Sequence, residues 1–335
     1  MTGASGVVGQ AILREIASRR PVISLVHRGN VTAGGTEVLR CDLSASHCGL
    51  SMSDYRSVVD RIVAVVHSAA LTEWGQPSGR YEAVNVDGTR QVVELAARAA
   101  APVHYISTAF VAALAGTPSV TLRADNVTAP YIRSKRQGEV VLAESGVPHS
   151  VYRPTNLVGD SRTGRTARPQ IVQLVSDWVC RGRARIFPVH PQNLLDVVPQ
   201  DVLAKAVVRA IERGETGGDY WVTHGARAMT MAAAIDILVE HARDRGREIA
   251  PPRLVHPDDI SADDMSALPP MSRTFVQVLS DVSEVTAACG GALPSSMGLL
   301  VPRFGLPDVP DTDAYRRTLR VAVPDPAAVA DRPAT

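Results

Sequence analysis

The chain is poor in cysteine: only Cys41, Cys48, Cys180 and Cys289 occur among its 335 residues. These four residues lack the regular spacing of metal ligands. We therefore expect no metal site, and we expect reduced thiols that are mostly packed in the interior of a cytoplasmic protein.

The chain also lacks an excess of charge of either sign. Its 35 basic and 34 acidic residues give a formal net charge of +1, which argues against a nucleic-acid-binding or membrane-surface protein. The longest apolar runs, such as 62–66, have the length of a strand, far short of the roughly 20 residues of a membrane helix. We expect neither a membrane span nor a signal peptide. With 45% hydrophobic residues, the chain can bury a sizeable core.

The first nine residues contain three glycines spaced three apart, directly before a helical pattern at 10–19. Gly3 allows a tight turn, Gly6 lets the backbone approach a pyrophosphate, and Gly9 lets the helix pack closely on a sheet. The amino end of that helix would hold the anion through free N–H groups and its dipole. The alternative is an ordinary glycine-rich turn, but the motifs that follow favour an α/β fold with a Rossmann-type, doubly wound parallel sheet.

The position of Met1 is unusual for such a loop, which normally follows a buried apolar strand. Either the natural start lies upstream, or the sheet lacks its innermost strand. We favour the first interpretation, because loss of a strand with neighbours on both sides would expose apolar surface in the middle of the sheet. An upstream extension of roughly five residues should then raise the melting temperature.

The pattern at 21–28 predicts a buried, β-branched strand that ends in basic residues. The adenosine ribose binds at the end of this second strand, where an acidic residue suits NAD and an arginine suits the 2′-phosphate of NADP. Arg28 therefore predicts NADP(H) as the cofactor, with His27 and Arg40 as helpers. The alternative is a solvated arginine at a strand end.

Two further strands are predicted at 37–42 and 62–70. Asp42 and Leu43, at the end of the first, are placed to meet the adenine edge. The second ends in small residues, as a backbone that passes beneath the cofactor requires; these are Ser68, Ala69 and Ala70.

Two polar residues in this region carry weaker signals. His67 is interpreted as a packed histidine at a strand end rather than a catalyst. Asn85, near the start of a predicted helix at 81–99, could steady a water molecule or a backbone carbonyl behind the active site. As an amide on the helix surface it would be equally ordinary.

The strand predicted at 103–108 ends in Ser107 and Thr108. Ligands bind outside the carboxyl ends of strands in open α/β sheets, so chemistry is expected here, although a Ser-Thr pair alone more often belongs to a turn. Tyr131 and Lys135 follow, four apart on one helical face. A tyrosine has a pKa near 10, which a neighbouring ammonium and an oxidised nicotinamide would bring toward the working pH. The ordered combination is far more specific than any of its parts.

The second half of the chain predicts a return to the sheet and a separate cap. We expect the Rossmann domain to comprise 1–160 and roughly 190–225, a smaller, mainly helical substrate cap to comprise 161–190 and 226–320, and 321–335 to be a disordered tail. The expected elements are a strand at 147–153, a polar loop at 155–164, helices at 171–181, 202–213 with Asp201 as N-cap, and 229–245, and a late strand at 220–222.

These residues resemble the extended short-chain dehydrogenases/reductases. The resemblance covers residues 1 to about 215 and depends on the glycine motif at 2–9, the Thr108, Tyr131 and Lys135 set, the segment 85–89, and Arg153 with Pro154. Four segments, at 67–74, 107–111, 159–164 and 196–199, are more similar to the thioester reductase and fatty acyl-CoA reductase branch.

The resemblance implies a role for each site residue. Tyr131 would protonate the substrate oxygen as hydride arrives, and Lys135 would bind the nicotinamide ribose and lower the pKa of Tyr131. Thr108 would hydrogen-bond the same carbonyl, and Asn85 would support the proton relay to Tyr131. The cofactor would contact the opening loop, the ends of the next strands, and Lys135; the residues are Gly3, Ser5, Gly6, Val7, Val8, Gly9, Arg28, Asp42, Leu43, Ser68, Ala69, Ala70 and Lys135.

The implied activity is NADPH-dependent reduction of an acyl thioester, bound to a carrier protein or to coenzyme A, either to the aldehyde alone or further to the alcohol. The same residues would serve a ketone reductase, a hydroxysteroid-type dehydrogenase or a nucleotide-sugar epimerase, and a non-catalytic NADP-binding regulator is a third alternative. An acyl carrier protein is the expected partner, acting in trans, and a homodimer is expected from the fold.

Overall fold

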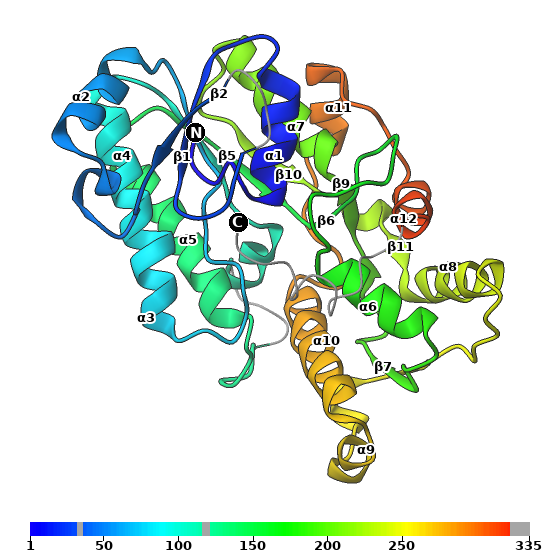
Figure 1. Ribbon diagram of the computed structural model, residues 1–335. Helices are drawn as coiled ribbons and strands as arrows, with labels where there is room; N and C mark the ends of the chain where they lie inside the picture. Colours follow the sequence, from blue (N-terminus) through cyan, green and yellow to red (C-terminus); the bar gives the residue numbers. More distant parts are fainter. Residues whose placement is uncertain (32–35, 116–120, 322–335) are drawn as a thin grey trace.

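A parallel sheet forms the centre of the computed structural model, which describes residues 1–31, 36–115 and 121–321 (Figure 1). Its strands pair in the order β2, β1, then β3, β4, β5 and β10, with Thr2 bridging β1 and β3. The strands are β1 (Val22–Val26), β2 (Thr36–Arg40), β3 (Val65–His67), β4 (Val103–Ile106), β5 (His149–Pro154) and β10 (Asp219–Val222). All pairs are parallel, as expected for a doubly wound fold.

Helices cover both faces of this sheet. On one face lie α1 (Val7–Ile16), α7 (Gln200–Glu212) and α11 (Met297–Phe304), which share a buried cluster with Val66 and Ile106. On the other lie α2 (Met52–Arg61), α4 (Gly88–Arg98) and α5 (Ala129–Glu144), whose cluster includes Val65 and Tyr105. Neighbouring strand residues therefore point into different cores, which explains why these strands are continuously apolar.

The innermost position of the sheet is occupied by only two residues, Met1 and Thr2. Thr2 forms isolated parallel bridges to Leu25 and His67, and the Met1 ammonium donates to the carbonyl of Ile23 at 2.6 Å. Below these residues lies a cavity of about 500 Å³, lined mostly by apolar side chains. Burial lowers the pKa of the Met1 ammonium to about 6. Where a full strand would lie between β1 and β3, the described chain thus has two residues and a cavity.

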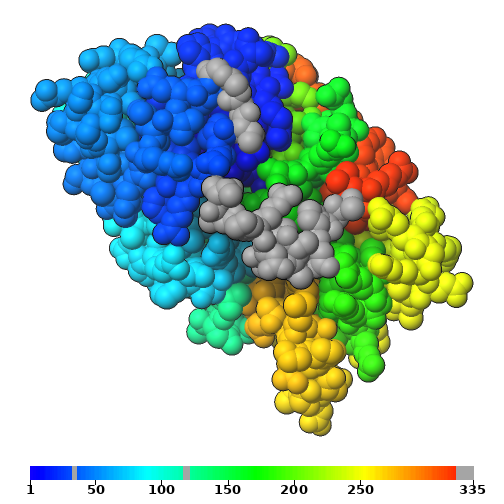
Figure 2. Space-filling model, in the orientation of Figure 1, coloured from blue at the N-terminus to red at the C-terminus, as the bar shows by residue number. Residues whose placement is uncertain are grey.

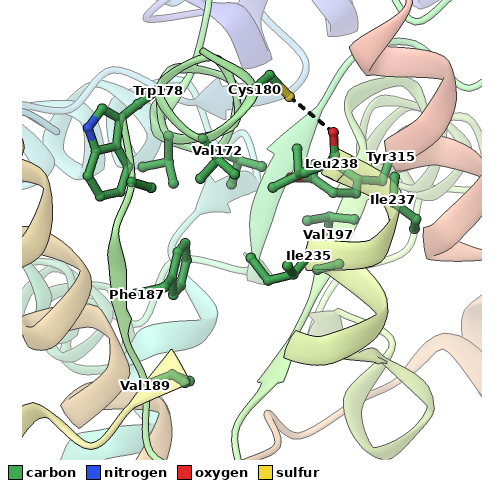
Figure 3. Close-up of a cluster of buried hydrophobic side chains, with 14 of the residues drawn as sticks. Val172, Trp178, Cys180, Phe187, Val189, Val197, Ile235, Ile237, Leu238 and Tyr315 are labelled. Atoms are coloured by element: carbon green, nitrogen blue, oxygen red, sulfur yellow. Dashed lines mark hydrogen bonds between the residues drawn. The ribbon is translucent and has the colours of Figure 1, made fainter. Parts of the chain in front are cut away.

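The remaining elements build the cap around a second core. Its helices are α6 (Ile171–Cys180), α8 (Met231–Asp244), α9 (Ala262–Ser266), α10 (Pro270–Ala288) and α12 (Asp311–Leu319). Two short strand pairs accompany them, β7 (Ile186–Pro188) with β12 (Arg253–Val255), and β8 (Leu194–Leu195) with β11 (Met229–Thr230). Figure 3 shows Trp178, Phe187, Ile235 and Leu238 among the side chains that fill this core. Figure 2 shows α8 and α9 of the cap in yellow and α10 in orange, away from the blue N-terminal part.

Several predicted boundaries need correction. Helix α7 begins at Gln200 after Pro199 as N-cap, and Asp201 instead accepts hydrogen bonds from the Ser161 amide and hydroxyl, both at 2.7 Å. The predicted loop at 155–164 contains a strand, β6 (Asn156–Val158), because it finds a partner in β9 (Val197–Pro199).

The helix predicted at 81–99 is interrupted. It divides into α3 (Ser78–Tyr81), a π-helical segment (Glu82–Asp87) and α4. Helix α11 lies in the range predicted for the cap, but it packs on α7. Its Met297, Leu300 and Phe304 belong to the buried cluster between the sheet and helices α1 and α7. The predicted disordered tail lies, apart from residue 321, outside the described residues.

All four cysteines are free thiols, and Cys41, Cys48 and Cys180 are buried. No helix among residues 1–31, 36–115 and 121–321 is both long and apolar enough to cross a membrane.

Candidate active site

The glycine loop has the close packing that its spacing predicts. Gly3 has φ +69°, and a Cβ at this position would lie 2.5 Å from the Ala69 amide nitrogen. A Cβ on Gly9 would lie 2.0 Å from the Gly3 carbonyl oxygen, and on Gly6 the same oxygen would be 3.2 Å away. A side chain is thus excluded at Gly3 and Gly9, because backbone atoms occupy the space it would need.

The amino end of α1 fits an anion. Within the described chain no side chain caps this end, and its first turn holds no acidic residue. Its N–H groups and dipole therefore suit a pyrophosphate. Ser5 donates to the carbonyl of Arg28 at 3.1 Å and so ties the loop to the end of β1. The chain could hold a dinucleotide here, over Gly6, Val7 and Val8.

The residues predicted to bind the adenosine end of the cofactor differ in their exposure and in the hydrogen bonds that they already make. Arg28 is exposed directly after β1, and the Arg40 guanidinium donates to the carbonyl of Gly29 at 3.0 Å. The Asp42 carboxylate accepts from the amide and hydroxyl of Ser44 at 2.9 and 2.6 Å, and these hydrogen bonds lower its pKa. Leu43 is buried. Among the described residues no hydrogen bond or ion pair involves the Arg28 side chain, whereas Asp42 already closes a turn.

The loop after β3 lies against the opening residues. Ser68 donates to the Thr2 carbonyl at 2.9 Å, and the Ala69 amide donates to the Thr2 hydroxyl at 3.3 Å, which places this loop and Ala70 beside Gly3. His67 lies between the hydroxyls of Thr2 and Thr89, at 2.7 and 3.1 Å. Burial lowers the pKa of His67 to about 3, so this ring is neutral and packed, as the sequence indicates.

Tyr131 and Thr108 come together at the carboxyl end of β4. The Thr108 hydroxyl accepts from the Phe110 amide at 3.4 Å, and the ring of Tyr81 lies 6.4 Å from that of Tyr131. Burial raises the pKa of Tyr131 to about 12, and the nearby Thr108 hydroxyl opposes this effect. In the protein alone the pKa of Tyr131 is therefore shifted upward, opposite to the direction that the family resemblance implies.

Lys135 is buried one turn along α5. Its Nζ donates to the carbonyl of Ile106 at 2.7 Å and lies 4.1 Å from the centre of the Tyr105 ring. Burial lowers the pKa of Lys135 to about 7, and the charge of Glu139 opposes the shift. The amine thus faces the end of β4, close to the strand end that carries Thr108.

Asn85 holds the loop after β3 against α5. Its carboxamide accepts from the Leu71 amide at 2.7 Å and donates to the Leu71 carbonyl at 3.0 Å and to Ser134 at 2.8 Å. It therefore contacts a backbone carbonyl, as predicted. The relay role remains a prediction.

Sequence reasoning missed a buried ionic cluster behind these residues. The Glu139 carboxylate accepts from Ser107 at 2.5 Å, from Arg153 at 2.8 and 2.9 Å, and from Arg136 at 2.9 Å. Arg153 also pairs with Asp219 on β10. The available signal was the four-residue spacing of Lys135 and Glu139, which puts both on one helical face.

A second missed cluster connects the cap to the segment before α5. Asp281 on α10 accepts from the Arg123 guanidinium at 2.6 Å and from the Val127 amide at 3.1 Å. Glu284 accepts from the Arg123 amide at 2.5 Å and from Asn126 at 2.7 Å. The cap helix therefore fixes the backbone that leads to Tyr131.

Comparison with known proteins gives a consistent result. The family model described as "Male sterility protein" matches residues 30–207. One component of the linear gramicidin synthase of Brevibacillus parabrevis is 27% identical over 180 residues, which are 50% of this chain and 4% of that protein. The chain thus spans a small fraction of that relative.

Two solved structures share the fold. The terminal R domain of the myxalamid PKS-NRPS pathway has a TM-score of 0.72 at 22% identity, covering 95% of this chain and 88% of its own. A thiolation-reductase di-domain from an archaeal non-ribosomal peptide synthetase has a TM-score of 0.69 at 15% identity, covering 95% and 73%. The match over residues 30–207 shows the family: this chain is a member of the male sterility protein family, the thioester reductase branch of the extended short-chain dehydrogenases/reductases, and an NAD(P)-binding oxidoreductase.

Proposed function

We propose that the chain uses NADPH to reduce an acyl thioester to an aldehyde, and that it can reduce the aldehyde again to the alcohol. The observation that carries this proposal is that Thr108 and Tyr131 lie together at the carboxyl end of β4, with Lys135 buried one turn away, in a chain of this family. Thioester reduction needs a proton donor and an oxyanion partner beside a hydride source.

The residues divide this work between them. When bound, the reduced nicotinamide supplies a hydride to the thioester carbonyl carbon. Tyr131, which its high pKa keeps protonated at neutral pH, gives its proton to the carbonyl oxygen, and the Thr108 hydroxyl donates to that oxygen as its charge develops. The hydroxyl of the resulting thiohemiacetal returns its proton to Tyr131 as the aldehyde C=O forms and the carbon–sulfur bond breaks, and the sulfur takes up a proton from water and leaves as the thiol.

The choice of NADPH over NADH depends on Arg28. Its guanidinium is exposed at the end of β1, and the neighbouring Ser5 contact keeps this strand end against the glycine loop. A guanidinium can hold the 2′-phosphate through two parallel hydrogen bonds. NADPH is therefore the proposed cofactor.

The proposed substrate carrier is a separate acyl carrier protein or coenzyme A. One solved neighbour is a thiolation-reductase di-domain, in which a thiolation domain and a reductase domain occur together. We extend that arrangement to this chain as an encounter between two molecules.

The test compares thioesters with ketones. Purified protein is supplied with NADPH and either acyl-CoA or acyl-carrier thioesters, and NADPH consumption is recorded together with free thiol. We expect one thiol per NADPH in the first reduction. Ketone turnover without thiol release would reject thioester reduction and favour a ketone reductase built on the same residues.

A further inference from the structure

A cavity inside the cap is lined almost entirely by apolar side chains. Its volume is about 70 Å³, and it lies between helices α6, α8, α10 and α12. In Figure 3, Phe187 of β7 lies on one side of it, and Ile235 and Leu238 of α8 lie on the other. Such a site suits a hydrocarbon, because burial of apolar surface drives its binding.

Two residues that line this cavity come from segments at the carboxyl edge of the sheet. Trp74 follows β3 and Asn156 follows β5, and both line the cavity. These strands flank β4, whose carboxyl end carries Thr108. In addition, Val282 of the cavity wall packs against the same buried cluster as Tyr131. A group attached to a carbonyl at Tyr131 can therefore enter the cap.

Two of the polar side chains in the wall already have partners. The Tyr315 hydroxyl is hydrogen-bonded to Ser176 at 2.7 Å, and Asn156 donates to the carbonyl of Asp196 at 3.1 Å. No charged side chain is among the lining residues within the described chain. A charged acyl group would therefore lose its water without gaining a counter-ion, which is costly.

We propose that this cavity binds the acyl group of the thioester and that this group is an uncharged hydrocarbon chain. The inference rests on the proposed function and specifies its substrate class. A volume of about 70 Å³ holds roughly five water-sized groups, and a methylene is of similar size. The preferred acyl group is thus about six carbons long, counting the carbonyl carbon.

The first test is a series of CoA thioesters assayed for NADPH consumption. We expect kcat/KM to rise roughly fourfold for each added methylene from propionyl to hexanoyl. Adipoyl-CoA, which has a carboxylate in place of the terminal methyl of hexanoyl-CoA, should be at least roughly a hundredfold poorer than hexanoyl-CoA.

The second test changes the size of the cavity. Ala234→Leu on α8 fills the wall and should reduce kcat/KM for hexanoyl-CoA about tenfold while sparing propionyl-CoA. Leu238→Ala should move the optimum to longer chains. Ala232→Leu on the exposed face of the same helix is the matched control and should leave the series unchanged.

Binding is measured separately by calorimetry with non-reducible amide analogues of hexanoyl-CoA and adipoyl-CoA. If no thioester is reduced but the hexanoyl amide binds more tightly and Ala234→Leu weakens it, the cavity assignment stands and the proposed function fails. If thioesters are reduced with equal kcat/KM for hexanoyl and adipoyl groups, and Ala234→Leu has no effect, thioester reduction stands and the cavity assignment is overturned.

Discussion

Tyr131 is the residue on which the proposed chemistry depends. Burial raises its pKa to about 12, so at neutral pH it carries a proton that it can donate. The nearby Thr108 hydroxyl opposes part of this shift, and the ring of Tyr81 lies 6.4 Å away. The phenol is therefore ready to act as an acid before a substrate arrives.

Replacing Tyr131 by phenylalanine should separate catalysis from binding. We expect Tyr131→Phe to lower kcat by at least roughly a hundredfold, the usual range for loss of a general acid, and to leave NADPH affinity nearly unchanged. Stopped-flow absorbance gives kcat and fluorescence titration gives the affinity. The control is Tyr81→Phe. It removes a hydroxyl that donates to the Glu73 carbonyl, and this variant should retain most activity. Full activity in Tyr131→Phe would remove this residue from the mechanism.

Lys135 should set the alkaline limit of activity. Burial lowers its pKa to about 7, and the Glu139 carboxylate opposes that shift. The ammonium form is present below this pKa and is lost as the pH rises through it. If the ammonium form is required, kcat should fall above about pH 7, well before Tyr131 could ionise.

Glu139→Gln should therefore move the alkaline limb of the kcat profile to lower pH, because the amide no longer favours the Lys135 ammonium. The position of the limb, rather than the size of kcat, is the readout, since the change also weakens the contacts with Ser107 and Arg153. Arg136→Gln removes an exposed partner of the same carboxylate and should move the limb little. An unchanged profile in Glu139→Gln would show that Glu139 does not control Lys135.

Arg28 should distinguish the two nicotinamide cofactors. Removing a guanidinium that holds a phosphate costs a charge-assisted contact, so Arg28→Ala should weaken NADPH binding by roughly tenfold to a hundredfold and NADH binding far less. Equilibrium titration of both cofactors measures this. Arg20→Ala, at the other end of β1, should affect neither. An equal loss of affinity for NADPH and for NADH in Arg28→Ala would mean that Arg28 does not contact the phosphate.

The elements with strong local signals were predictable from the sequence. Apolar runs identify β1, β4 and β5, and the glycine spacing identifies the turn into α1. The clusters of Glu139 with Arg153 and of Asp281 with Arg123 were not, because each joins segments that become neighbours only in the folded chain. For the same reason β6 was missed, since its partner β9 lies about 40 residues further along.

The gap between β1 and β3 has a consequence for stability. The cavity of about 500 Å³ there leaves apolar side chains without neighbours, which is unfavourable. A five-residue β-branched extension before Met1 should fill the gap and raise the melting temperature, measured by calorimetry. A glycine-serine extension of equal length is the control. Equal melting temperatures for the two versions would contradict this account of the gap.

The candidate site lies between the two cores of the molecule, that of the sheet domain and that of the cap. The sheet domain supplies the glycine loop and Tyr131, and the cap supplies the apolar cavity. Helix α10 contributes to both, because Val282 lines the cavity while Asp281 and Glu284 hold the segment before α5. In the proposed reaction, α10 would thus help to position both the acyl group and its proton donor.

The most direct test of thioester reduction at this site is transfer of label from NADPH to product. The protein is given an acyl thioester and NADPH deuterated on the transferred position, and aldehyde and thiol are analysed by mass spectrometry. The account predicts one deuterium on the aldehyde carbon, two on that carbon in alcohol formed by a second reduction, and one thiol per molecule of aldehyde or alcohol. Release of thiol together with an unlabelled carboxylic acid would show hydrolysis instead, and would contradict it.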